Sequence, residues 1–169
     1  MTSARRLISA LLLGLPILAQ PQPDPSFPPD PCESLLAGSA TQAAWPGIVL
    51  DAYSGDTLVV MLKGIGTRRV KLTGLRAPKG AEPLATVSRF HLSHIAKGLR
   101  VFVILDPPWP VWPEEVTAPV EDFTEAQLSS GLGRQVEEEM KDLTPYVACR
   151  CRKAEQSARG AALGIWGRR

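Results

Sequence analysis

The sequence lacks an apolar run long enough to cross a membrane as a mature helix. Its one continuous run, Leu7–Ala19, is shorter than the roughly 20 residues that a transmembrane helix needs. The run follows Arg5 and Arg6 and ends at small, cleavable residues, which is the pattern of a secretory signal. We therefore expect residues 1–19 to be a signal peptide that is cut before Gln20, and the mature chain to be secreted or periplasmic. An uncut run would instead anchor the chain in a membrane.

Histidine and cysteine are also scarce, with two and three residues. His91, His94, Cys149 and Cys151 are residue types that bind zinc, but their spacing matches no strong zinc motif, so we expect no zinc site. In an exported protein, a disulfide from Cys32 to either Cys149 or Cys151 would leave one thiol over. A bridge between Cys149 and Cys151 is disfavoured, because side chains two positions apart on a helix diverge.

Basic residues are missing from residues 20–44, which hold repeated prolines and the acids Asp24, Asp30 and Glu33. Prolines at this density prevent helix formation and strand pairing. Residues 20–45 are therefore predicted to be a Pro-rich acidic linker, in which only Glu33–Ala37 suits a short helical turn. The remaining residues, 46–169, are enough for one domain with a buried core.

Three β-rich runs open this domain: Ile48–Tyr53, Thr57–Leu62 and Arg69–Leu75. The turn signals Ser54–Asp56 and Gly64–Gly66 separate the runs, so we predict a three-stranded meander with tight hairpins.

Further along the chain, proline, glycine and capping residues mark the ends of two helices. The predicted elements are a helix over Pro83–Lys97, a buried strand over Arg100–Leu105, an edge strand over Glu115–Val120, a short helix over Thr124–Ser130 and a helix from Pro145 to about Arg159. This order predicts an α+β fold, namely a small five-stranded Greek-key β-barrel of the OB type with about three helices.

Several short segments occur in the order found in the staphylococcal-nuclease-like (thermonuclease) family. They are Ser54–Thr57, Val70–Lys79, Gly98–Val101, Gly131–Leu132 and Leu163–Trp166. From Gly47 to Trp166 the chain thus resembles that family. The resemblance implies an OB fold and calcium-dependent phosphodiester hydrolysis. In that mechanism acidic residues bind the ion, a glutamate lies near the attacking water, and two arginines contact the phosphate.

Most of the residues that this mechanism needs are replaced. Asp56 matches the first acidic ligand, but the second falls on Arg76, and the next ligating residue falls on Ala77. The glutamate position holds Lys79, a cation that can neither bind calcium nor act as a base at neutral pH. The first arginine position holds Lys71, whose ammonium group cannot make the two parallel hydrogen bonds to phosphate that a planar guanidinium group makes.

The second arginine position falls near Pro113–Glu115, where the chain has no arginine. We therefore expect no catalytic residues, with Asp56 at most a remnant metal ligand. Calcium would be needed only if a nuclease with an altered site persists.

Charge is distributed unevenly along the chain. Residues 46–105 hold nine basic and three acidic residues, whereas residues 106–143 hold two basic and ten acidic residues. On an OB barrel the meander is where oligonucleotides bind, so Arg69, Lys71, Arg76 and Lys79 are the candidate phosphate contacts. Aromatic residues make up only 6% of the chain, and Tyr53 alone could stack a base there. Alternatively, these cations pair internally with the acidic segment.

A second candidate surface is the Pro/Trp segment Asp106–Pro113. If Trp109 and Trp112 were exposed they would offer a contact for a protein partner, and if buried they would cap the barrel. Trp166 is expected in the core, and Glu137–Glu139 is expected to be a solvated face.

The sequence therefore predicts an exported, catalytically inactive thermonuclease-like domain that binds nucleic acid, another polyanion or a protein. Two alternatives remain open. One is a metal-dependent endonuclease in which Asp56 holds the metal and Lys71 and Arg76 contact phosphate. The other is a structural scaffold.

Overall fold

The computed structural model describes residues 30–35, 44–104, 114–118 and 122–167. The predicted signal peptide, most of the predicted linker, and the Pro/Trp segment with Trp109 and Trp112 lie outside these residues. Within the described ranges, no helix is long and apolar enough to cross a membrane.

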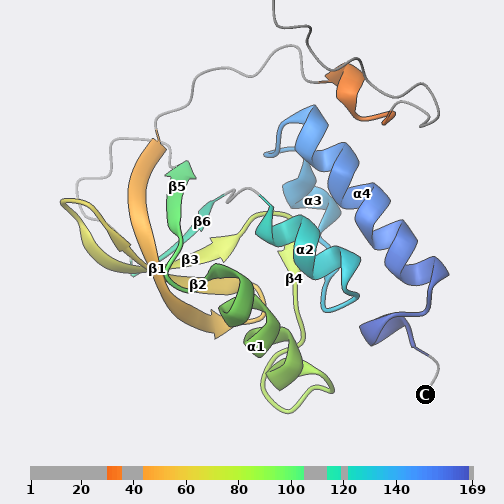
Figure 1. Cartoon of the computed structure of the whole chain (residues 1–169), viewed down its shortest axis with the longest axis horizontal. Coiled ribbons are helices and arrows are strands. Elements are labelled where there is room, and N and C mark those ends of the chain that lie inside the picture. The colour runs from red at the N-terminus through yellow and green to blue at the C-terminus, as the bar shows by residue number, and fades with distance from the viewer. Residues whose placement is uncertain (1–29, 36–43, 105–113, 119–121, 168–169) are drawn as a thin grey trace, which may run out of the picture.

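The fold is mixed α+β and is built on a five-stranded sheet (Figure 1). The strands lie in the order β5 (Arg100–Ile104), β1 (Ala44–Ser54), β2 (Thr57–Leu62), β3 (Gly66–Leu72) and β6 (Glu115–Ala118). Neighbours are antiparallel, except that β3 and β6 are parallel. Residues 44–48 of β1 pair with β5, and residues 47–54 pair with β2, so Gly47 and Ile48 pair on both sides. No ladder joins β5 to β6 among the described residues, so closure into a five-stranded barrel stays a prediction.

The predicted meander is confirmed, but its third run is divided in two. Gly74 has φ +76°, a left-handed conformation that glycine adopts without steric cost, and the chain turns there. Beyond the turn, the short strand β4 (Leu75–Arg76) leaves the main sheet and pairs with β7 (Arg134–Gln135) in a second, two-stranded sheet. Neither β4 nor β7 was predicted. Their pairing moves Arg76 away from the strand that carries Arg69.

The three predicted helices are present, with small shifts at their ends. They are α1 (Ala85–Ala96), α2 (Phe123–Ser129) and α4 (Pro145–Gly160), and a short α3 (Glu137–Met140) was not predicted. Thr144 caps α4 by accepting a hydrogen bond from the Val147 N–H, as its position before Pro145 suggested. Figure 1 shows α2, α3 and α4 grouped beside the sheet, while α1 packs against β1.

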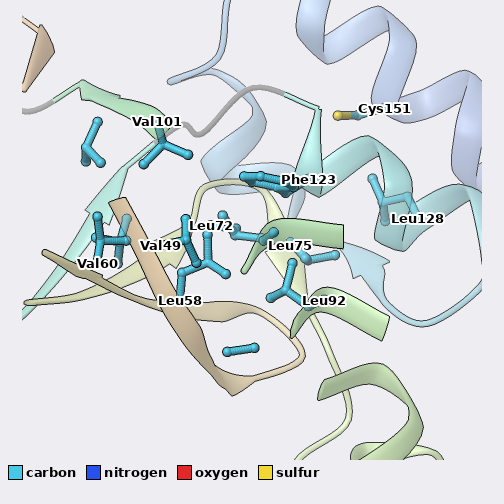
Figure 2. Close-up of a cluster of buried hydrophobic side chains, with 14 of the residues drawn as sticks. Val49, Leu58, Val60, Leu72, Leu75, Leu92, Val101, Phe123, Leu128 and Cys151 are labelled. Atoms are coloured by element: carbon cyan, nitrogen blue, oxygen red, sulfur yellow. The ribbon is translucent and has the colours of Figure 1, made fainter. Parts of the chain in front are cut away.

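One hydrophobic core joins the sheet to these helices (Figure 2). Its largest fully buried side chains come from the strands β1 to β5 and the helices α1 to α3, and they include Val49, Leu58, Val60, Leu72, Leu92 and Leu128. The predicted strand at Arg100–Leu105 is present as β5, but the prediction that it is buried is wrong, because its side chains alternate between buried and exposed. Val101 and Val103 are buried, whereas Phe102 is 66% exposed. Leu105 lies outside the described residues.

The disulfide joins Cys32 to Cys149, with the two Cα atoms 5.7 Å apart. Cys151, two positions along α4, faces the core and is a buried free thiol. The bridge holds the 3₁₀ turn η1 (Glu33–Leu35) against α4, and Figure 1 shows the two side by side. The helical turn predicted within the linker is thus present, and Cys149 is the partner of Cys32.

Candidate functional site

Asp56 lies in the hairpin turn between β1 and β2, and its side chain is completely buried. Its Oδ1 accepts hydrogen bonds from Ser54 Oγ at 2.7 Å and from Thr57 Oγ1 at 3.1 Å. Its Oδ2 accepts a hydrogen bond from the Ala77 N–H at 3.4 Å and lies 3.1 Å from Lys79 Nζ. Both oxygens of this buried carboxylate are therefore satisfied by protein groups.

These surroundings do not fit a calcium ion. Calcium takes six to eight oxygen ligands, mostly carboxylates and carbonyls. The ammonium group of Lys79 lies against Oδ2 of Asp56. The neighbouring residues Arg76 and Ala77 supply no carboxylate. In the part of the chain that the structure describes, no group of three or more His, Cys, Asp or Glu side chains is placed to hold a metal.

Lys71 is held by an acidic residue from α3. Its Nζ lies 2.5 Å from Glu139 Oε1, and Glu139 Oε2 accepts a hydrogen bond from the Gly74 N–H at 2.9 Å. Both charged side chains are less than one-third exposed. The interpretation of Glu137–Glu139 as a solvated face is therefore wrong for Glu139. Glu137 is exposed and pairs with Arg152.

Arg69 also pairs with the acidic segment. Its guanidinium lies 3.3 Å from the exposed carboxylate of Glu114 and 4.0 Å from the centre of the Tyr53 ring. The ring that could have stacked a base is thus covered on one face by an arginine. For Arg69 and Lys71, the structure has the internal pairing that the sequence left open as the alternative.

Arg76 is in a different situation, because it lies directly opposite Arg134 in the β4–β7 ladder. Both side chains are exposed, and no ion pair links either guanidinium to a carboxylate among the described residues. Together they line a hollow of about 400 Å³, whose walls also include Pro78, Glu82 and Trp166. Arg134 was missed from the sequence, although it stands two positions after the Gly131–Leu132 segment.

The C-terminal 3₁₀ turn η2 (Gly164–Trp166) forms the far wall of this hollow. The Ile165 N–H donates to the Gly131 carbonyl at 2.8 Å, and the backbones at Gly131 and Gly164 approach so closely that a Cβ on either would overlap the other segment. The Arg159 guanidinium covers the Trp166 ring at 4.2 Å from its centre. Trp166 is only partly buried, so its assignment to the core is wrong.

A buried network of hydrogen bonds connects the turn that contains Asp56 to the helices α1 and α2. Gln127 on α2 donates through Nε2 to the Gly55 carbonyl at 2.6 Å and to the Ser88 carbonyl at 3.0 Å. Its Oε1 lies 2.5 Å from His91 Nδ1. His91 thus orients the side chain of Gln127, and the hydrogen bond from Gln127 to Gly55 connects α2 to the turn. No sequence signal distinguished Gln127 from other polar residues on helices.

Comparison with models of known protein families gives no match, and comparison with characterised proteins gives no significant similarity.

Proposed function

We propose that the chain is a thermonuclease-like domain of the OB type that binds a polyanion such as single-stranded nucleic acid and does not hydrolyse it. The observation that carries this proposal is the ion pair between Asp56 and Lys79. Metal-assisted hydrolysis needs several oxygen ligands at one point, and here a fixed ammonium group takes the place of the cation.

Strand order supports the OB part of the proposal. The long strand β1 pairs with β5 near its start and with β2 over the rest of its length, and β3 pairs with β6 on its other edge. A sheet in this order closes into a five-stranded barrel if β5 and β6 meet. The segments that suggested the family lie at turns and at the ends of elements. Ser54–Thr57 contains the first hairpin turn, Gly131–Leu132 follows α2, and Leu163–Trp166 leads into and forms η2.

Of the four candidate phosphate contacts, Arg76 has the least compensated charge. Arg69, Lys71 and Lys79 each have a carboxylate within 3.3 Å, whereas Arg76 has none within ion-pair distance among the described residues. A cation that is already paired with a carboxylate must break that ion pair, and lose its interaction energy, before it can bind a phosphate. We therefore place the centre of the polyanion contact at β4 rather than on β3.

The test measures binding and cleavage of a short labelled single-stranded DNA by the purified, disulfide-bonded chain. Fluorescence anisotropy across a NaCl series, with calcium or with chelator, should give binding that weakens as salt rises and no cleavage. Arg76→Ala should weaken binding and lower the salt slope by about one, since one phosphate contact is lost. Arg100→Ala, which removes an exposed cation from edge strand β5, is the matched control and should leave the affinity almost unchanged.

Two outcomes would contradict the proposal. Calcium-dependent cleavage that disappears in Asp56→Ala would establish the nuclease alternative. If the chain does not bind DNA even at low salt, the proposal of a polyanion ligand is wrong, and a protein partner becomes the better explanation.

A protein partner is the second candidate, and an exposed apolar row supports it. Ile48 on β1 lies opposite Met61 on β2, and Phe102 lies on the adjacent β5. These side chains are 48%, 46% and 66% exposed. Neighbouring exposed apolar side chains are typical of contact surfaces. If this row binds a second copy of the chain, sedimentation should show a dimer that Phe102→Lys abolishes.

A further inference from the structure

We propose that the hollow between β4, β7 and η2 is a binding site for a terminal phosphate group, held by Arg76 and Arg134 with Trp166 at its wall. This inference rests on the proposed function and deepens it, because it names the group of the polyanion that is bound and the residues that bind it. Three features of the described residues lead to it.

The first feature is the cross-strand pair of arginines. Arg76 and Arg134 are direct partners in the antiparallel β4–β7 ladder, so their side chains leave the same face of the ribbon. Like charges in this position destabilise a sheet, and no carboxylate among the described residues forms an ion pair with either one. A bound dianion between the two guanidinium groups would convert this repulsion into two charge-assisted interactions.

The second feature is the indole of Trp166. Its Nε1 is buried and has no hydrogen-bond partner among the described residues. A covered donor without an acceptor costs roughly 1–3 kcal/mol, and most such donors in folded proteins are paired. The ring borders the hollow. If the ring turns so that Nε1 faces the hollow, an oxyanion held there would supply the missing acceptor.

The third feature is the shape and lining of the hollow. Its volume of about 400 Å³ lies in the range of small-molecule sites and exceeds that of one phosphate group. Pro78, Pro83 and Ile165 give it apolar walls, against which a sugar or base could pack. Glu82 also borders the hollow, so the anion is expected at the arginine end, and the formal charge of the lining is still positive.

A phosphate fits the donors better than a carboxylate does. Two guanidinium forks and one indole N–H offer more donors than the two oxygens of a carboxylate can accept from separate directions. A phosphate monoester carries three terminal oxygens and up to two charges. Such a group occurs as free phosphate, on a mononucleotide or at the end of an oligonucleotide. An internal phosphodiester carries only one charge and fewer free oxygens.

The experiment titrates the purified, disulfide-bonded chain with inorganic phosphate, with a nucleoside 5′-monophosphate and with the same nucleoside lacking phosphate, using calorimetry. The monophosphate should bind and the nucleoside should not. Arg134→Ala should lower the affinity for the monophosphate at least tenfold, and Arg134→Lys should lower it less. Trp166→Phe should lower the same affinity several-fold. Arg100→Ala is the control and should bind like the unaltered chain.

The outcomes separate this inference from the proposed function. Absence of phosphate and monophosphate binding, or equal losses in Arg134→Ala and Arg100→Ala, would overturn the site. If DNA binds regardless of a 5′-phosphate while the monophosphate does not bind, the site fails and the proposed function survives. If the monophosphate binds but DNA does not, the site stands and the polyanion proposal fails. Equal affinity for phosphate and monophosphate would support the site and assign it to free phosphate.

Discussion

The ion pair between Asp56 and Lys79 makes a quantitative prediction about stability, because its two members differ in exposure. The Asp56 side chain is 1% exposed and the Lys79 side chain is 54% exposed. Asp56→Asn keeps an acceptor for Ser54 and Thr57 but turns an amide NH₂ toward the Ala77 N–H and the Lys79 ammonium. The loss of a charged acceptor and the facing donors should together cost about 3 kcal/mol of unfolding free energy.

Lys79→Ala should cost much less. Water can replace an ammonium group that is half exposed, and the three hydrogen bonds to Asp56 remain, so we expect a loss of about 1 kcal/mol. In the double variant the introduced amide no longer faces an ammonium group. The total loss in the double variant should therefore be about 3 kcal/mol, which corresponds to a coupling near 1 kcal/mol.

The measurement is urea unfolding at neutral pH, followed by circular dichroism with the disulfide intact. The slope of free energy against urea should be the same for all variants, so that shifts of the midpoint report stability. Lys97→Ala is the control, because its ammonium lies 3.9 Å from Asp51 and is 62% exposed. It should cause no measurable change. The reasoning is refuted if Lys79→Ala loses as much stability as Asp56→Asn, or if calcium stabilises Lys79→Ala.

Three further predictions concern the cysteines and the half-exposed carboxylate of Asp51. Cys149→Ser opens a disulfide between residues 117 positions apart, and the open chain gains conformational entropy when it unfolds. Thermal or urea unfolding should therefore show a loss of roughly 3–5 kcal/mol of unfolding free energy, and an unchanged midpoint would contradict this reasoning. Burial raises the pKa of the Cys151 thiol to about 12, so a thiol reagent at pH 8 should label it in urea but not in the native chain. Hydrogen bonds from Ser93 Oγ and the Ala52 N–H lower the pKa of Asp51. The resulting stability is present above about pH 3.8 and lost as pH falls through the lower folded value, and Ser93→Ala should reduce this acid dependence of the unfolding midpoint.

The elements that sequence reasoning found are those that local signals specify. Thr144 and Pro145 start α4 through a cap and a fixed φ angle, and the Ser54–Asp56 turn sets the first hairpin. These signals act within a few residues and do not depend on the rest of the fold. The existence and approximate ends of α1, α2 and α4 follow from such signals alone.

The candidate site depends on contacts between distant residues, which the sequence does not reveal. Lys71 meets Glu139 across 68 positions, and the β4–β7 ladder brings Arg76 to Arg134 only because the chain turns at Gly74. A charge run predicts that cations exist on a surface. It does not predict which of them have a carboxylate partner, and that difference decides which residues can bind an anion.

Glu139 connects the two halves of this site. One of its carboxylate oxygens binds the Lys71 ammonium, and the other accepts the Gly74 N–H. The acid that neutralises the cation on β3 therefore also fixes the turn after which β4 leaves the main sheet. Beyond that turn, β4 places Arg76 opposite Arg134, so one carboxylate contacts both the paired cation on β3 and the turn that precedes the arginine pair. The cations Arg69 and Lys71 on β3 are paired with carboxylates, whereas Arg76 and Arg134 form no ion pair among the described residues, so an anion that binds this domain should be drawn to the β4–β7 ribbon.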